Sequence, residues 1–283
     1  MRREILLNHN VKIELIVDDA LKVLHELPPN QFHLAILDPP YLVTEAPDVH
    51  GEHLDVLKTE INWNVLFRRV YRVLRDEAML VVFGHLSTFA KLWNVIESAG
   101  FGYVTDIIWV KNEPVNFLQA KKKPLSQHET ITVWKKGKMR YNWEEAMSHG
   151  HGRPYYRKRD DIDSFYNIRL VDTISDGSRY MTDVLFAPSK PCMPFSERTE
   201  HPTQKPLVLV ERLVRAFSFR SENVIDPFAG SGTTLVACAK AGRNCLGIEI
   251  NEKYAEIIRR RVKSSVQLSL EVFESPVSSC KEV

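Results

Sequence analysis

The sequence has little that would point to a disulfide-bonded, zinc-binding or membrane-spanning protein. Only four of its 283 residues are cysteines, and none has Cys-x-x-Cys spacing, so we expect neither a zinc site nor a redox pair. No apolar run is long enough to cross a bilayer. The first residues, Met-Arg-Arg-Glu, lack the apolar core of a signal peptide. We therefore expect a cytoplasmic protein with no metal site and no membrane partner.

Net charge is also small, at +2, but it is unevenly spread. Between Lys111 and Asp160 there are twelve Lys or Arg against five Asp or Glu, a local balance of +7. A basic segment of this kind often contacts phosphates, although an ordinary solvated face has the same composition. The 44% hydrophobic and 26% charged residues suit one large globular domain, or a domain with an insert.

Short apolar runs alternate with amphipathic segments along much of the chain. The expected strands are 11–17, 34–37, 78–83, 104–110, 129–134, 224–225 and 245–250. The expected helices are 20–27, 62–74, 87–99, 207–217, a segment that ends at 241, and 252–262. This alternation predicts an α/β fold with a doubly wound, mostly parallel sheet.

The sequence Asp38-Pro-Pro-Tyr41 follows an expected buried strand, where α/β proteins bind ligands. Pro39 and Pro40 make the turn stiff. The Asp38 carboxylate and the Pro39 carbonyl can each accept one N–H of an exocyclic amine, while Tyr41 can stack on the ring that carries it. This trio suits chemistry on a nucleobase amine through positioning and electrostatics. A plain Pro-rich turn with an N-capping Asp is the structural alternative.

A second motif, Asp226-Pro-Phe-Ala-Gly-Ser-Gly-Thr-Thr234, lies between an expected strand and an expected helix. Gly230 and Gly232 allow a tight turn beneath a ligand. Glu249, 23 residues after Asp226, lies where an acid can accept ribose hydroxyls. No Lys follows the last glycine, and a third glycine is missing, which argues against a P-loop and a pyrophosphate ligand. A nucleoside without phosphates fits, and S-adenosylmethionine is such a ligand.

With these motifs the chain resembles the beta group of DNA amino-methyltransferases, which methylate adenine N6 or cytosine N4 with S-adenosylmethionine. In that group Asp-Pro-Pro-Tyr precedes the target-recognition region, and Phe-x-Gly-x-Gly comes last. Here Asp38–Tyr41, the irregular centre and Phe228–Gly232 follow the same order. His201-Pro-Thr-Gln-Lys-Pro206 matches the segment before the cofactor loop. The resemblance covers about residues 11–262 and implies a Rossmann-like S-adenosylmethionine-dependent methyltransferase fold with permuted motif order.

The resemblance also implies a division of the chain and a role for individual residues. Residues 1–134 would be the catalytic half, 135–200 a central target-recognition insert, 201–262 the cofactor-binding half of the same domain, and 263–283 a peripheral tail. The flipped base would be held by Asp38, Pro39, Pro40 and Tyr41. The cofactor would be bound by Asp19, Thr203, Lys205, Asp226, Phe228, Gly230, Ser231, Gly232, Thr233 and Glu249. The resemblance carries no residue across in the recognition region, but basic side chains interleaved with aromatics suit phosphate contacts and base stacking. On that ground the residues expected to contact DNA are Lys121, Lys122, Lys123, Arg153, Arg157, Lys158 and Arg159.

The implied activity is site-specific methylation of adenine N6 in double-stranded DNA. Asp38 favours adenine, because members that act on cytosine N4 more often carry Ser at that place. Cytosine N4 methylation, RNA methylation and an inactive nucleic-acid-binding module remain open alternatives; a nicotinamide dehydrogenase is disfavoured by the missing third glycine. The sequence also leaves open whether the protein forms a homodimer, as the group often does, and whether a restriction endonuclease accompanies it.

Overall fold

The computed structural model describes residues 2–8, 11–39, 61–115, 117, 120–147 and 180–274. The strands are β1 (Arg2–Asn8), β2 (Lys12–Val17), β3 (Phe32–Leu37), β4 (Leu74–Gly84), β5 (Gly102–Val115), β6 (Ser126–Lys136), β7 (Val184–Ala187), β8 (Asn223–Asp226) and β9 (Asn244–Glu249). The helices are α1 (Ala20–Glu26), α2 (Trp63–Val73), α3 (Leu86–Ser98), α4 (Trp143–Ala146), α5 (Leu207–Phe217), α6 (Thr233–Ala241) and α7 (Glu252–Glu274), with a 3-10 turn at Lys190–Cys192.

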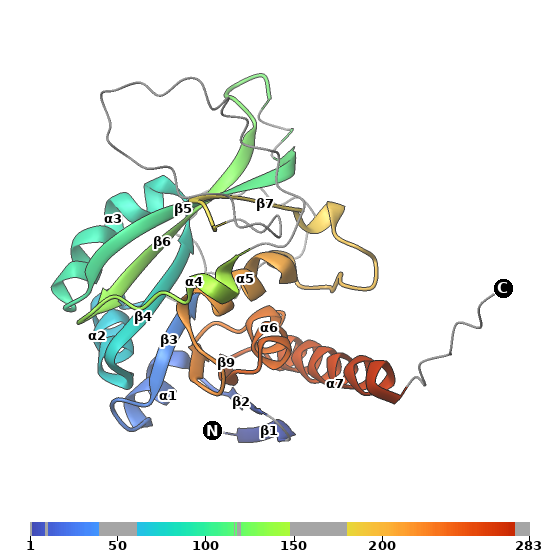
Figure 1. Cartoon of the computed structure of the whole chain (residues 1–283). Coiled ribbons are helices and arrows are strands. Elements are labelled where there is room, and N and C mark those ends of the chain that lie inside the picture. The colour runs from blue at the N-terminus through green and yellow to red at the C-terminus, as the bar shows by residue number, and fades with distance from the viewer. Residues whose placement is uncertain are drawn as a thin grey trace, which may run out of the picture.

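The described residues form one nine-stranded sheet in the order β1-β2-β9-β8-β3-β4-β6-β5-β7 (Figure 1). The five strands from β2 to β4 in this order all run parallel to one another. β1 pairs antiparallel with β2 at one edge, β6 runs antiparallel to both β4 and β5, and β7 runs parallel to β5 at the other edge. The expected doubly wound, mostly parallel sheet is therefore confirmed.

Between β3 and β8 the direction in which successive strands are added to the sheet reverses. From β3 the chain continues through α2 to β4, away from β8, whereas from β8 it continues through α6 to β9, away from β3. A doubly wound sheet opens a crevice outside the carboxyl ends of its strands at such a switch point. The predicted motifs at Asp38 and Asp226 follow the two strands that flank it.

Helices cover both faces of the sheet, as a mostly parallel sheet requires (Figure 1). Successive side chains of β3 point to opposite faces of the sheet. Leu34 and Ile36 pack into the core shared with α5, α6 and α7. Ala35 and Leu37 pack into the core shared with α1, α2 and α3. All four side chains are at most 1% exposed. A continuous apolar run, rather than a polar alternation, is what such a doubly covered strand needs.

The fold contains elements that the sequence patterns did not predict. β1 and β7 are edge strands, and only one edge of each pairs in the described sheet, so their sequences carry little of the apolar run that marks a buried strand. α4 is a single turn, too short for a periodic pattern. The last helix does not end at Val262 but continues to Glu274. Its Ser-rich end extends a helix that is already nucleated, which costs far less than starting one.

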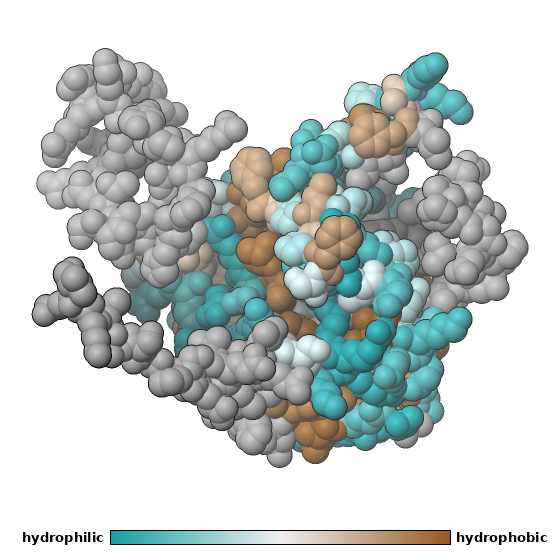
Figure 2. All heavy atoms as spheres, turned by 90° about the vertical axis from the view of Figure 1, so that its right-hand side faces the viewer, coloured by the Kyte–Doolittle hydropathy of each residue, from teal (hydrophilic) through white to brown (hydrophobic). Residues whose placement is uncertain are grey.

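The side of the molecule that lies to the right in Figure 1 carries hydrophilic residues over much of its lower right part (Figure 2). Hydrophobic residues gather higher up and at the lower edge of the same view. In the part of the chain that the structure describes, no helix is both long and apolar enough to cross a membrane.

Candidate active site

Acidic side chains follow four neighbouring parallel strands, each where its strand ends. Val17, the last residue of β2, pairs with Glu249 on β9, and Asp226 at the end of β8 pairs with Gly247 on β9. β3 pairs with β8 in the same direction, so its carboxyl end reaches the same edge of the sheet. The acids that this topology gathers along the crevice are Asp18, Asp19, Glu249, Asp226 and Asp38.

Asp38 is paired with Lys205, although the two residues lie 167 positions apart in the sequence. Lys205 Nζ donates to Asp38 Oδ2 at 2.6 Å, and the two side chains are 7% and 22% exposed. An ammonium group at this distance favours the ionised carboxylate and fixes its orientation. A carboxylate has about four lone-pair sites, so Asp38 can hold Lys205 and still accept from an amine.

The segment before α5 is fastened so that Lys205 enters the crevice. Gln204 is buried, and its side-chain oxygen accepts from the backbone N–H and the hydroxyl of Thr199, both at 2.8 Å. Its side-chain amide donates to the carbonyl of Glu197 at 2.8 Å. The Glu197 carboxylate in turn accepts from the N–H of Leu207, the first residue of α5. Lys205 therefore stands on a rigid turn rather than on a loose loop.

Two further charged residues were not predicted as site residues: Glu129, which lies next to Lys205, and Lys111, which pairs with Glu129. Glu129 Oε2 lies 3.7 Å from Lys205 Nζ, and Glu129 Oε1 lies 2.7 Å from Lys111 Nζ. The sequence held a signal: Lys111 continues the inward face of Ile107 and Trp109, at a spacing of two residues. A charged residue at the end of a buried face of a strand indicates a buried ion pair.

The Asp226–Thr234 segment forms a tight turn that leads into α6. Gly230 and Gly232 have φ values of +51° and +78°, a region that residues with a side chain rarely adopt. Glu249 braces the turn, because its Oε2 accepts from the N–H of Gly230 at 2.8 Å. Its Oε1 accepts from the N–H of Asn251, also at 2.8 Å. The loop and the end of β9 are thus one bonded unit.

Asp226 lies at the base of this turn, where it is only 4% exposed. Its Oδ1 accepts from the N–H of Phe228 at 2.9 Å. Burial raises the pKa of Asp226 to about 7, and the neighbouring Asp38 and Glu249 act in the same direction. A carboxyl group this far from its ordinary value, beside a crevice, is typical of a ligand-binding site.

Polar groups from two other elements contact the turn. From α7, Arg261 Nη1 donates to the carbonyl of Ser231 at 2.8 Å and to the hydroxyl of Thr233 at 2.9 Å. The imidazole of His201 packs so close to Gly230 that a Cβ there would lie 2.9 Å from its Nε2. Burial and the nearby Lys205 lower the pKa of His201 to about 4, so its ring is neutral at pH 7.

The other predicted residues have the following surroundings in the structure. Asp19 caps α1 by accepting from the N–H of Lys22 at 2.8 Å. Thr203 is exposed. Lys121, Lys122 and Lys123 are exposed in the turn between β5 and β6. The predicted residues that lie outside the described part of the chain are Pro40, Tyr41, Arg153, Arg157, Lys158 and Arg159.

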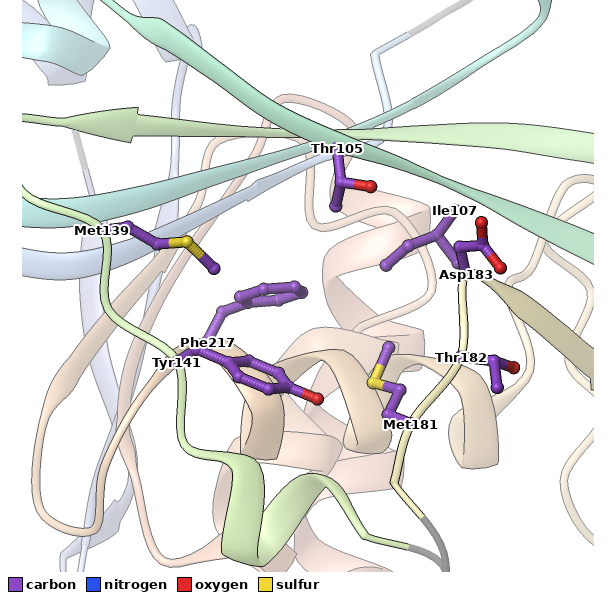
Figure 3. Close-up of a pocket in the computed structure, with 8 residues that line it drawn as sticks. All are labelled: Thr105, Ile107, Met139, Tyr141, Met181, Thr182, Asp183 and Phe217. Atoms are coloured by element: carbon purple, nitrogen blue, oxygen red, sulfur yellow. The ribbon is translucent and has the colours of Figure 1, made fainter. Parts of the chain in front are cut away.

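A cavity of about 230 Å³ lies apart from these groups, between β5 and the end of α5 (Figure 3). Its lining is mainly apolar and contains none of the predicted site residues. The side chains that line it are Thr105, Ile107, Met139, Tyr141, Met181, Thr182, Asp183 and Phe217. The cavity therefore does not belong to the crevice.

The charges of the crevice define the class of ligand that fits it. The row of acids at the strand ends suits hydroxyl groups and cations, whereas the glycine turn lacks the lysine that would hold phosphates. A tight glycine turn followed by a helix and an acid at the end of the next strand is typical of a nucleoside site. Fold and site together therefore define an α/β protein with a crevice for a cationic, phosphate-free nucleoside.

Comparison with known proteins places the chain more closely. Residues 32–260 match the family model described as DNA methylase, and the chain belongs to this family. It is 26% identical over 267 residues to the type II methyltransferase M2.DpnII of Streptococcus pneumoniae, covering 89% of this chain and 90% of that protein.

Two solved structures illustrate the similarity. The S-adenosyl-L-methionine complex of TTHA0409, a putative DNA modification methylase from Thermus thermophilus, superposes with a TM-score of 0.54 at 26% identity, over 89% of this chain and 95% of that one. The cytosine-N4-specific PvuII DNA methyltransferase shares the fold, with a TM-score of 0.59 at 15% identity over 89% and 93% of the two chains.

Proposed function

We propose that this protein transfers a methyl group from S-adenosylmethionine to the N6 amine of a flipped-out adenine in double-stranded DNA. The observation that carries the proposal is the pairing of Asp38 with Lys205. Asp38 follows β3, on the opposite side of the switch point from the glycine turn that follows β8. One side of the crevice then holds an oriented carboxylate for an amine, and the other a turn suited to a nucleoside. Membership of the DNA methylase family supports both halves of this assignment.

The cofactor would lie against the glycine turn. Glu249 would accept from the ribose hydroxyls, Asp226 would face the cationic methionine end, and Asp19 would meet the adenine end. The backbone of Phe228, Gly230, Ser231, Gly232 and Thr233 would line the methionine side, with Thr203 and Lys205 near its carboxylate. S-adenosylmethionine would supply a methyl group on a sulfonium centre, whose S–C bond breaks as the new N–C bond forms.

The target amine would be held on the opposite side. Asp38 and the carbonyl of Pro39 would each accept one N–H, which restores some nucleophilic character to a nitrogen whose lone pair is delocalised into the ring. Flipping the base costs a few kcal/mol. Stacking on Tyr41, worth roughly 1–3 kcal/mol, would offset much of that cost. The nitrogen must finally lose one proton, and a carboxylate already bound to that N–H is placed to receive it.

Cytosine N4 is the second candidate, because the PvuII enzyme shares the fold and an Asp38 carboxylate can hold either amine. We favour adenine because the resemblance to the beta group associates Asp at this place with adenine. The permuted motif order of that group, the four-part division of the chain, and DNA contacts from Lys121, Lys122 and Lys123 belong to the same proposal. So do a cytoplasmic location, a homodimer and an accompanying restriction endonuclease.

Substitution of Asp38 tests the proposed site directly. We expect Asp38→Ala to abolish methyl transfer to DNA and to leave binding of the neutral S-adenosylhomocysteine within a fewfold of wild type, since Asp38 faces the base rather than the cofactor. Transfer would be followed with radiolabelled cofactor, and binding by calorimetry. Glu97→Ala, which removes an exposed acid from α3, is the matched control and should be fully active. Full activity in Asp38→Ala would refute the site.

A further inference from the structure

Four buried or half-buried charges of alternating sign form a continuous chain that starts at Asp38. Lys205 Nζ lies 2.6 Å from Asp38 Oδ2 and 3.7 Å from Glu129 Oε2. Glu129 Oε1 lies 2.7 Å from Lys111 Nζ. The formal charges of these four groups sum to zero, because each lysine of the series is paired with an acid.

This series of charges links strands whose ends meet at one edge of the sheet. β6 runs antiparallel to β4, and Gly84 at the carboxyl end of β4 pairs with Thr130. Glu129 therefore lies beside the carboxyl end of β4, next in the sheet to the end of β3 that carries Asp38. Lys111 reaches Glu129 from the neighbouring strand β5, where its ammonium lies 5.1 Å from the Trp109 ring centroid.

Because these side chains are buried, water screens their charges weakly, and the loss of one charge has a large effect on the others. The side chains of Lys111, Glu129 and Lys205 are 8%, 9% and 7% exposed. Burial opposes the charge of Lys205, but Asp38 and Glu129 outweigh it, so the pKa of Lys205 lies above its ordinary value. Burial likewise opposes the charge of Glu129, but Lys205 and Lys111 outweigh it and lower its pKa.

His85 is another titratable group near this chain. It precedes α3 at the end of β4, and burial lowers its pKa, which favours the uncharged ring. Among these four residues, removal of Glu129 alone would leave two buried ammonium groups and one carboxylate, that of Asp38, which pairs with Lys205. Removal of Glu129 and Lys111 together would restore neutrality.

We propose that Glu129 is a positioning residue that holds Lys205 against Asp38, and that Glu129 and Lys111 together keep this group of four charges neutral beside a cationic sulfonium. The inference rests on the proposed function, because it is the transfer of a methyl from sulfonium to an amine at Asp38 that brings a positive charge close to Lys205. Without Glu129, the ammonium groups would repel the substrate form of the cofactor more than its neutral thioether product.

Comparing the two forms of the cofactor isolates this effect from packing. S-adenosylmethionine and S-adenosylhomocysteine differ by one methyl group and one positive charge. A unit charge roughly 10 Å away, at an effective dielectric constant of about 20, changes a binding constant on the order of tenfold. We therefore expect Glu129→Gln to weaken S-adenosylmethionine relative to S-adenosylhomocysteine by about tenfold, measured as the ratio of the two dissociation constants by calorimetry.

A set of matched variants makes the test decisive. The double variant Lys111→Met/Glu129→Gln should return the ratio to within about threefold of wild type, because it restores neutrality. Lys111→Met alone should shift the ratio in the opposite direction, towards S-adenosylmethionine, and provides a second test if Glu129→Gln fails to fold. Glu113→Gln removes an exposed acid from the same strand as Lys111 and should leave the ratio unchanged.

Other outcomes would overturn the inference. Equal weakening of both ligands in Glu129→Gln, or a double variant no better than the single one, would reduce Glu129 to a packing role. A wild-type protein that binds neither ligand would instead overturn the proposed function, and this inference with it. Wild-type binding of both ligands, with the same ratio in every variant, would overturn this inference alone.

Discussion

The carboxyl group of Asp226 is buried in surroundings that disfavour its ionised form. Burial is the main cause, and the carboxylates of Asp38 and Glu249 add to it, which together raise the pKa of Asp226 from 3.8 to about 7. In the unfolded chain the same group ionises near its ordinary value. Between about pH 4 and pH 7 the folded protein therefore holds a proton that the unfolded chain has lost, and stability falls as the pH rises through this window.

This residue gives a prediction about pH and stability. Asp226→Asn removes the charge but keeps an oxygen for the N–H of Phe228, so the ligand-free variant should be more stable than wild type at pH 8, by at most roughly 4 kcal/mol. At pH 4 the two should differ little. Chemical unfolding at both pH values would measure this, with the exposed Asp76→Asn as control. A variant that is less stable than wild type at pH 8 would contradict the assignment.

The sequence predicted which individual residues belong to the site better than it predicted which of them contact one another. Asp38 and Lys205 were each predicted from a local motif, but their pairing over 167 positions depends on how β3 and the turn before α5 meet. Glu129 was read only as the start of a strand. Its role depends on the register of β6 against β4 and β5, which no local pattern determines.

The glycine turn is the element on which the cofactor assignment depends most. A Cβ on Gly232 would lie 3.0 Å from Ile258 Cγ1 and 3.3 Å from the Ile258 Cα, which cannot move without shifting α7. The residue also has a φ of +78°, which costs a residue with a side chain about 1–2 kcal/mol. Space and backbone conformation therefore both require glycine here.

We predict that Gly232→Ala lowers the free energy of unfolding by at least about 1 kcal/mol and weakens S-adenosylmethionine binding more than tenfold. The turn would have to move, and with it the backbone that is proposed to line the cofactor. Thermal unfolding and calorimetry would measure the two effects. Gly102→Ala is the control, because the nearest atoms to its Cβ belong to the flexible side chain of Lys135. Wild-type binding by Gly232→Ala would show that this turn does not hold the cofactor.

The predictability of each element followed its burial and length. α5 lies at 207–217, as its apolar periodicity predicted, and α2 starts one residue after its predicted Asn62, which caps it. β7 was missed because it has four residues at the edge of the sheet, with Phe186 75% exposed. A short strand with an outward aromatic side chain shows neither alternation nor a buried run.

For the molecule as a whole, Arg243 joins elements that are distant in sequence. Its side chain is fully buried at the start of β9, where it donates to the carboxylate of Glu145 on α4 at 2.8 Å and to the carbonyl of Ser218 after α5 at 2.8 Å. It also donates to the carbonyl of Ala241 at the end of α6. Three helices are thus fastened to the sheet by one guanidinium group, whose five donors make such sharing feasible.

Loss of this connection should destabilise the entire fold. We predict that Arg243→Met lowers the free energy of unfolding by roughly 3 kcal/mol, because several buried acceptors lose their donor. Arg220→Met removes another partner of Glu145, but one whose side chain is 72% exposed, and should change stability by less than about 1 kcal/mol. Denaturant titration of both variants would measure the contrast. Equal effects would mean that Arg243 does not join these elements.

The fold class followed from the alternation of strands and helices, and the sheet order did not. A doubly wound sheet allows several orders, and the one observed depends on pairings such as Leu34 with Val224, which lie 190 positions apart. The switch point between β3 and β8 is what unites the two predicted motifs in one crevice. That the Asp38 motif and the Asp226 motif form one site was inferred from the resemblance to a family. Neither motif by itself determines where the other lies in the fold.

A single labelling experiment decides whether the protein transfers methyl groups to adenine in DNA. Pure protein would be incubated with methyl-labelled S-adenosylmethionine and unmethylated duplex DNA, and the DNA digested to nucleosides for analysis. We expect label in N6-methyladenine. Label in N4-methylcytosine would preserve the site and contradict the base assignment. No label in the DNA, from a protein that binds the cofactor, would contradict the claim itself.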